Sequence, residues 1–207
     1  MNDAPLNSAI INVCVLPPAE VSSQCVQLSQ SLESDGTMFA LNDISKFAHM
    51  TIFMARFADS KISHVLQATK LALSRVYPFF CEHTGYFMTA GRYLEVSYRK
   101  SAELTVLHEL LVNTLSPYRL NPGNPFEEAY FTPYTEEQQK NAKETGYDLA
   151  RHLYRPHITL TRYKESQLLE PFPGFAPTKL SFMLSQIGVY KADDNGAIYE
   201  QLAVFPL

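Results

Sequence analysis

The chain has 207 residues, of which 46% are hydrophobic and 12% aromatic, so it carries enough apolar side chains for a sizeable core. This composition excludes a disordered chain, and the length suits one large domain or two closely packed lobes. The formal net charge of −4 argues against a general binder of long nucleic acid, which needs a broad basic surface. A local basic pocket is compatible with this charge.

The amino-terminal sequence and the cysteines indicate the compartment. No Lys or Arg precedes the first apolar run, which is short and interrupted by Asn12, so the pattern is not that of a signal peptide. No stretch approaches the length of a membrane-spanning helix. Cys14, Cys25 and Cys81 are an odd number without metal-type spacing, which argues against a disulfide framework or a zinc site. We therefore expect a soluble, reduced, cytoplasmic protein.

The first part of the chain predicts a strand and a helix twice in succession. Residues 8–16 are β-branched and apolar and are followed by two prolines, and Pro18 suits the first turn of an amphipathic helix. Residues 46–57 predict a second strand, after which Asp59 can cap a helix with an apolar stripe.

The middle of the chain predicts a hairpin, a helix and a long loop. Two β-rich runs, 79–89 and 92–99, are separated by Ala-Gly. Ser101 can cap a leucine-rich helix, and His108 on its apolar stripe is interpreted as a buried, hydrogen-bonded histidine. Residues 116–134 are dense in Pro, Asn and Gly yet carry five aromatic residues, which predicts a long loop. Long ordered loops are often functional.

The last part of the chain begins with a capped helix and continues mainly with strands. Thr135 and Gln138 form a capping box for a mostly polar helix that runs towards residue 147. A strand at 154–163 and a short helix near 164–170 are expected next. Two final strands, at 179–192 and 196–205, complete an α+β protein with about seven strands and four or five helices.

Two phrases, FAHMTIF and RPHITLTRY, place a histidine two residues before a threonine within a β-like run. Side chains alternate between the faces of a strand, so His49 and Thr51 share one face, as do His157 and Thr159, while their apolar neighbours face the core. In each half of the chain the motif is followed by a helix and then by a hairpin, which suggests internal duplication. If the two strands meet, four polar groups converge.

Such a quartet suits phosphodiester chemistry without a metal. Imidazole has an ordinary pKa near 6.5, so at neutral pH one ring can accept a proton while the other, held charged by a phosphate, donates one. Threonine hydroxyls can donate hydrogen bonds to the non-bridging oxygens as negative charge builds. The sequence leaves open which histidine is the base. Either histidine alone is better explained as a core residue, whereas the pair in matching apolar frames favours a site.

The two phrases, about a hundred residues apart, resemble the defining motifs of the 2H phosphoesterase superfamily, which includes the 2′-5′ RNA ligase-like proteins and RNA cyclic phosphodiesterases. The segment NVCVLPPAEV resembles the opening strand and helix of its members. The resemblance implies a bilobal α+β fold, in which two mainly antiparallel sheets with outer helices form a V-shaped cleft. Residues 1–207 would then be a single domain of two pseudo-symmetric lobes, with one motif on each lobe.

The resemblance also implies a function. His49 and His157 would be catalytic, Thr51 and Thr159 would bind phosphate, and no metal or cofactor would be needed. Members hydrolyse 2′,3′-cyclic phosphates or 2′-5′ linkages, so we expect a small nucleotide or an RNA terminus as the partner, no long duplex, no membrane, and a monomer. The alternatives are a nucleotide-binding regulatory module without turnover, 2′-5′ RNA ligase activity, and a structural protein with both histidines in its core.

Neighbouring residues add candidates to the site. In a regular strand Arg155 and Thr161 would share the face of His157, so Arg155 is a candidate for holding phosphate through its planar fork. The alternative for Arg155 is a position at the rim in solvent. Four aromatic residues are candidates for stacking on a nucleobase, although loop aromatics also pack on their own protein. They are Tyr130, Phe131, Tyr134 and Tyr154.

Overall fold

The computed structural model describes residues 7–34, 36–42, 44–120, 135–164, 179–193 and 196–207, and all pairings between its strands are antiparallel. The larger sheet has the strand order β2-β1-β8-β9, and the smaller sheet the order β4-β5-β6. Two short strands, β3 and β7, form a third sheet. The strands are β1 (Ser8–Val15), β2 (Met50–Ala58), β3 (Phe79–Cys81), β4 (His83–Met88), β5 (Tyr93–Tyr98), β6 (His157–Arg162), β7 (Phe182–Leu184), β8 (Gln186–Ala192) and β9 (Ile198–Pro206).

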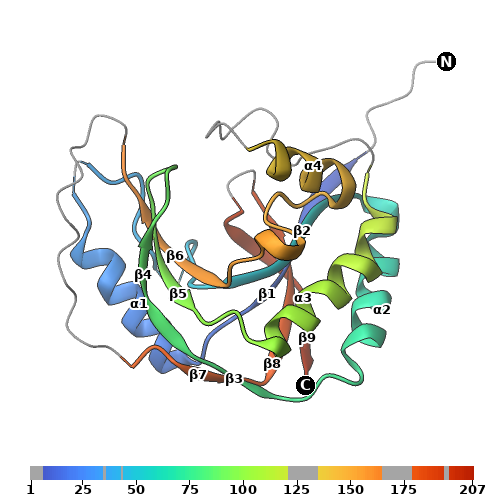
Figure 1. The fold of residues 1–207 in the computed structure, drawn as a ribbon, viewed down its shortest axis with the longest axis horizontal. Helices are drawn as coiled ribbons and strands as arrows, with labels where there is room; N and C mark the ends of the chain where they lie inside the picture. The colour runs from blue at the N-terminus through green and yellow to red at the C-terminus, as the bar shows by residue number, and fades with distance from the viewer. Residues whose placement is uncertain (1–6, 35, 43, 121–134, 165–178, 194–195) are drawn as a thin grey trace.

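Helices cover the outer sides of the two sheets (Figure 1). Helix α1 packs on the smaller sheet at β6, while α2 and α3 pack on each other, with α3 in contact with β2 of the larger sheet. The strands β2 and β6, which carry the two H-x-T phrases, are themselves in contact. The helices are α1 (Ala19–Ser31), α2 (Ile62–Leu73), α3 (Ala102–Leu115) and α4 (Glu136–Thr145), with short 3-10 helices η1 (Asp59–Lys61), η2 (Ser116–Tyr118) and η3 (Arg151–Leu153). These features confirm the predicted α+β class with mainly antiparallel sheets.

Two predicted strands are divided in the structure, so the described residues contain nine strands rather than about seven. The run 79–89 splits into β3, which pairs with β7, and β4, which pairs with β5. The run 179–192 splits in the same way into β7 and β8, because each part pairs with a different sheet. The helix expected near 164–170 and the part of the loop from residue 121 to 134 lie outside the described residues.

Helix ends follow the capping signals in the sequence. The Ser101 hydroxyl accepts a hydrogen bond from the backbone N–H of Leu104 at 3.2 Å. Thr135 and Gln138 form the predicted capping box at the start of α4. That helix ends at Gly146, which has φ +86°, and a Cβ there would lie 2.8 Å from Cβ of Ala55. Glycine is therefore required at this position both by conformation and by the close approach of β2. By contrast, no side-chain cap forms at η1, where Asp59 was expected to cap a helix.

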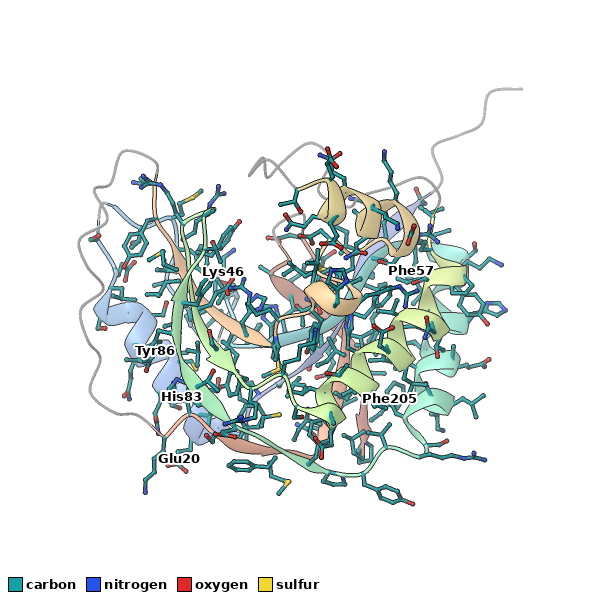
Figure 2. All side chains as sticks on the ribbon, in the orientation of Figure 1. Glu20, Lys46, Phe57, His83, Tyr86 and Phe205 are labelled. Carbon is teal, nitrogen blue, oxygen red and sulfur yellow. The ribbon has the colours of Figure 1, made fainter. Side chains whose placement is uncertain are left out.

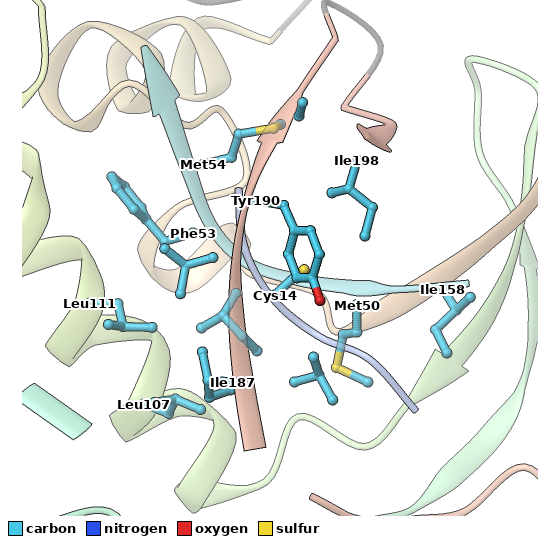
Figure 3. Packing of buried hydrophobic residues seen from close by; sticks show 14 of the residues in the cluster. Cys14, Met50, Phe53, Met54, Leu107, Leu111, Ile158, Ile187, Tyr190 and Ile198 are labelled. Carbon is cyan, nitrogen blue, oxygen red and sulfur yellow. The ribbon is translucent and has the colours of Figure 1, made fainter. Parts of the chain in front are cut away.

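A hydrophobic core joins the two sheets and their helices. Leu111 of α3 lies on the side of Phe53 and Leu107 beside Ile187, both residues of the larger sheet (Figure 3). Met50 from β2 and Ile158 from β6 are both fully buried in the same cluster, so the apolar residue inside each H-x-T phrase anchors its strand as expected. The three cysteines are free and buried. None of the described helices has the length and apolarity to cross a membrane.

Candidate active site

A β-bulge follows the first H-x-T phrase. In the β1–β2 ladder Cys14 pairs with Thr51, but Val13, the residue before Cys14 in β1, pairs with Phe53. Ile52 is therefore an extra residue in β2, inserted directly after the threonine. His49 lies immediately before the first residue of β2 and is half-buried.

The second phrase has the same feature. Glu95 of β5 pairs with Thr159, whereas Leu94 pairs with Thr161, so Leu160 is an extra residue in β6 directly after the threonine. Both phrases thus have a histidine, an anchoring apolar residue, a threonine and then a bulge. The two phrases therefore share this local geometry.

The bulge in β6 corrects the expectation that Thr161 shares the face of His157. That expectation assumed a regular strand, and the inserted residue shifts the alternation by one. Thr161 is fully buried, and its hydroxyl donates a hydrogen bond to the carbonyl of Phe39. Arg162 pairs instead with Tyr93 on the site face, and its guanidinium lies 4.9 Å from the centre of the Tyr93 ring. Arg162 was not assigned to the site from the sequence.

Buried side chains from helices hydrogen-bond the carbonyls of both bulge residues. Nδ1 of His108 in α3 donates to the carbonyl of Ile52 at 2.7 Å, and the hydroxyl of Ser29 in α1 donates to the carbonyl of Leu160 at 2.6 Å. A bulge removes a carbonyl from the sheet ladder, and a buried carbonyl needs a partner. Each H-x-T phrase is therefore held in place by one polar residue of the helix behind it.

His108 also contacts the segment that leads into β6. Its Nε2 accepts a hydrogen bond from the backbone N–H of Arg151 at 2.8 Å, which fixes the proton of the neutral ring on Nδ1. The ring is fully buried and stacks on Tyr154 with centroids 4.1 Å apart. Burial lowers the pKa of His108 to about 4, so the ring is neutral at pH 7. The interpretation of His108 as a buried, hydrogen-bonded residue is confirmed.

His49 and His157 have the same local geometry. Nδ1 of His49 lies 2.9 Å from the carbonyl of Phe47, and Nδ1 of His157 lies 2.7 Å from the carbonyl of Arg155. A carbonyl only accepts hydrogen bonds, so Nδ1 carries a proton in both rings.

The two rings also interact electrostatically. Burial is the main cause that lowers the pKa of His49, and the positive charge of His157 lowers it further. Hydrogen bonds to the backbone of Phe47 and Gly196 oppose this shift. His49 is accordingly neutral at pH 7, and a neutral imidazole can accept a proton.

Asn12 of β1 orients the hydroxyl of Thr51. The Asn12 side chain is fully buried, and its amide nitrogen donates a hydrogen bond to Oγ1 of Thr51 at 3.0 Å. Because Oγ1 accepts this bond, the hydroxyl proton of Thr51 is free to be donated to another group. The sequence signal for Asn12 is a polar residue that interrupts an apolar strand.

Arg155 and Glu95 form a partly buried ion pair next to His157. Nη2 of Arg155 lies 2.9 Å from Oε2 of Glu95, and Nε2 of His157 lies 3.6 Å from Oε1 of the same carboxylate. The guanidinium of Arg155 also lies 4.5 Å from the centre of the Phe87 ring. Arg155 is thus packed between a carboxylate and an aromatic ring, rather than extended into solvent at the rim. Glu95 was not identified from the sequence, although it is a charged residue within an apolar strand.

A second carboxyl group lies within electrostatic reach of His157. Asp148, in the segment after α4, is 9% exposed and accepts a hydrogen bond from Nε2 of Gln138 at 3.2 Å. Burial raises the pKa of Asp148, whereas the hydrogen bonds that it accepts and the positive charge of His157 lower it. Two acidic residues, Glu95 and Asp148, therefore interact with His157, whereas the acidic residue that interacts with His49 is Asp193.

The prediction that four aromatic residues could stack on a nucleobase is wrong for one of them. Tyr154 is 2% exposed and stacks on His108, so its ring cannot also stack on a nucleobase. Tyr130, Phe131 and Tyr134 lie outside the described residues. Phe87, which is 48% exposed, is an aromatic residue on the site face that was not considered from the sequence.

The other histidines have separate surroundings. His152 pairs with Glu137 at 2.8 Å, and His64 is exposed on α2. His83 packs against Tyr86 on β4, with ring centroids 5.3 Å apart (Figure 2). In the described part of the chain, no three or more His, Cys, Asp or Glu side chains are grouped so that they could hold a metal ion.

Comparison with known proteins shows the fold. No family model and no curated protein matches the sequence. Among solved structures, E. coli LigT in its apo form has a TM-score of 0.63 at 15% identity, over 97% of this chain and 98% of LigT. TT0787 of Thermus thermophilus has a TM-score of 0.61 at 18% identity, over 96% of this chain and 97% of that chain. A structure described as a phosphoesterase has a TM-score of 0.60 at 16% identity, over 96% and 98% of the two chains. The chain therefore has the fold of LigT, which confirms the fold implied by the resemblance to 2H phosphoesterases.

Proposed function

We propose that this protein is a 2H-type phosphodiesterase that hydrolyses a 2′,3′-cyclic phosphate or a 2′-5′ phosphodiester of a small nucleotide or RNA end without a metal. The observation that carries the proposal is the matched geometry of the two H-x-T phrases. In each phrase Nδ1 of the histidine bonds the carbonyl two residues earlier, and a bulge follows the threonine. The LigT fold supports it, and LigT itself has been solved with phosphate and with 3′-AMP.

The surroundings of the two histidines favour one division of roles. The lowered pKa of His49 makes it the base, which takes a proton from the attacking water. His157 is then the acid, and its Nε2 lies 3.6 Å from the carboxylate of Glu95. The water oxygen forms a bond to phosphorus, the bond from phosphorus to the ribose oxygen breaks, and His157 gives its proton to that oxygen.

The remaining residues of the site hold the phosphate. The hydroxyls of Thr51 and Thr159 donate hydrogen bonds to the non-bridging oxygens, and Asn12 leaves the Thr51 proton free for this purpose. Arg155 adds a cationic fork next to His157. The net charge of −4 favours a short substrate over a duplex, and we propose that the protein acts as a cytoplasmic monomer.

A turnover panel tests the proposal. The substrates are a nucleoside 2′,3′-cyclic phosphate, a 2′-5′ oligoadenylate, a cyclic dinucleotide and a 3′-5′ dinucleotide, all assayed with a chelator present. Removal of a general acid or base costs about 10²- to 10⁴-fold in rate, so His49→Ala and His157→Ala should each lose activity to this extent. His64→Ala, which changes an exposed histidine on α2, should leave activity unchanged.

Three results would contradict the assignment. Full activity in either histidine variant would exclude that ring from the chemistry. Binding of nucleotides by the wild-type protein without cleavage of any member of the panel would favour the nucleotide-binding regulatory module instead. Joining of RNA ends in preference to hydrolysis would favour the ligase activity, which runs the same chemistry in reverse.

A further inference from the structure

Glu95 is a buried carboxylate beside the catalytic nitrogen of His157, and the proposed proton transfers do not use it. Its side chain is 5% exposed, and it pairs with Thr159 across the β5–β6 ladder, so it shares the site face. One carboxylate oxygen lies 3.6 Å from Nε2 of His157 and the other 2.9 Å from Nη2 of Arg155. Burying a charge is costly unless the charge is paired. The position of the Glu95 carboxylate in the site therefore calls for an explanation.

The charges around Glu95 nearly cancel. Arg155, from the segment before β6, is the positive group that pairs with it, and the imidazole of His157 faces it from β6. Asp148, from the segment after α4, contributes a second acidic group near His157, and Tyr147 lies within electrostatic reach of Glu95 and Arg155. From the other motif, His49 is the titratable group that interacts with His157. The region therefore has much less positive charge than the arginine and the histidines alone would give.

A phosphate in this region must lie close to Glu95. A group that receives a proton from Nε2 of His157 lies within about 3 Å of that nitrogen, which is itself 3.6 Å from the carboxylate. Repulsion between the carboxylate and the phosphate grows with the charge on the phosphate. A phosphodiester carries one negative charge, whereas a phosphomonoester carries about 1.5 to 2 at pH 7.

We propose that Glu95 makes the site selective for singly charged phosphodiesters over doubly charged phosphomonoesters. This inference rests on the proposed function, in which the substrate is a diester and the hydrolysis product of a cyclic phosphate is a monoester. Hydrolysis of such a substrate then raises the charge of the bound ligand beside Glu95 and weakens its binding. Glu95 in this account is a specificity residue that disfavours the product and leaves the proton transfers to the two histidines.

The test compares two ligands that differ in charge and by a single methyl group. The probes are 3′-deoxyadenosine 2′-monophosphate and its methyl ester, which keep the ribose 2′ oxygen common to both proposed linkages and lack the 3′ hydroxyl needed for cyclisation. Calorimetry gives the two dissociation constants for the wild-type protein and for Glu95→Gln, which keeps the side-chain shape without the charge. The ratio of the two constants removes any effect of the substitution that is equal for both ligands.

At pH 7, Glu95→Gln should improve binding of the monoester relative to the methyl ester by about tenfold or more. The reason is that the repulsion between the Glu95 carboxylate and the additional negative charge of the monoester is worth more than about 1.4 kcal/mol. The matched control is Glu82→Gln, because Glu82 pairs with Arg99 on the exposed surface, and its ratio should equal that of the wild type. An unchanged ratio in Glu95→Gln, or a shift in favour of the methyl ester, would overturn the inference.

The wild-type protein alone provides a second test, which does not depend on the folding of a variant. Between pH 5 and pH 8 the monoester loses its second proton, with a pKa near 6, while the methyl ester keeps one charge. The wild type should prefer the methyl ester more strongly at pH 8 than at pH 5. A site dominated by positive charge would show the opposite trend, which would refute the role of Glu95. If neither ligand binds, the proposed function fails as well, which separates that outcome from a failure of this inference alone.

Discussion

Lowering the pH from 7 to 5 should destabilise the folded protein by about 2 kcal/mol through His108 alone. The pKa of His108 is about 4 in the folded protein, against an ordinary value of 6.5 in an unfolded chain. The unfolded chain therefore binds this proton first as the pH falls, so the stabilising contribution is complete above pH 6.5 and is lost between pH 6.5 and 4. The full loss is about 3 kcal/mol, since each unit of pKa shift is worth about 1.4 kcal/mol.

Urea unfolding at the two pH values measures this effect. In His108→Gln and His108→Phe the titrating ring is absent, so the drop in unfolding free energy from pH 7 to pH 5 should be smaller by about 2 kcal/mol than in the wild type. The other titrating groups, including His49 and Asp148, are present in all three proteins and cancel in the comparison.

The same variants also report on the two hydrogen bonds of the ring. His108→Phe can keep the stacking on Tyr154 but leaves the carbonyl of Ile52 and the N–H of Arg151 without partners. Each buried group left unpaired costs about 1–3 kcal/mol, which should appear as a loss of stability at pH 7. An equal pH dependence in wild type and variants would refute the assignment of a buried neutral ring to His108.

Two further substitutions test the supports of the site, and a third tests the packing of β8. Ser29→Ala removes the donor to the β6 bulge carbonyl and should lower the unfolding free energy by about 1–3 kcal/mol in urea, whereas a change within about 0.5 kcal/mol would show that the bond is not needed. Asn12→Leu should lower kcat by about tenfold with an unchanged circular dichroism spectrum, because Thr51 loses the donor that orients it, and an unchanged kcat would contradict that role. Gly188→Ala places a Cβ 2.2 Å from the Tyr190 ring and should cost about 1–3 kcal/mol in thermal unfolding; wild-type stability would show that the ring moves freely.

The positions of most elements follow from local patterns in the sequence, whereas their pairing does not. The caps at Ser101 and Thr135 were predicted because the residues that form them are within three positions of each other. The division of the run 79–89 between two sheets depends on β7, about a hundred residues later in the chain. No periodicity within a single strand carries that information.

The residues of the site also fall into two groups, those that a local sequence pattern indicates and those that depend on strand pairing. The two H-x-T phrases are local, so His49 and His157 could be selected from the sequence as a pair. Arg162 was missed because the bulge that turns it to the site face depends on the register with β5. Glu95 and Asn12 were missed because they reach the motifs from neighbouring strands, although each is a polar residue in an apolar run. Such residues are useful candidates once strand pairing is known.

We propose that His49 and His157 act on one phosphate, and NMR titration of the imidazole signals with inorganic phosphate tests this claim. The signals of both rings should shift with a single common dissociation constant, while those of the exposed His64 and His152 should not follow it. A response from only one of the two rings, different dissociation constants for the two, or no response from either would contradict the claim.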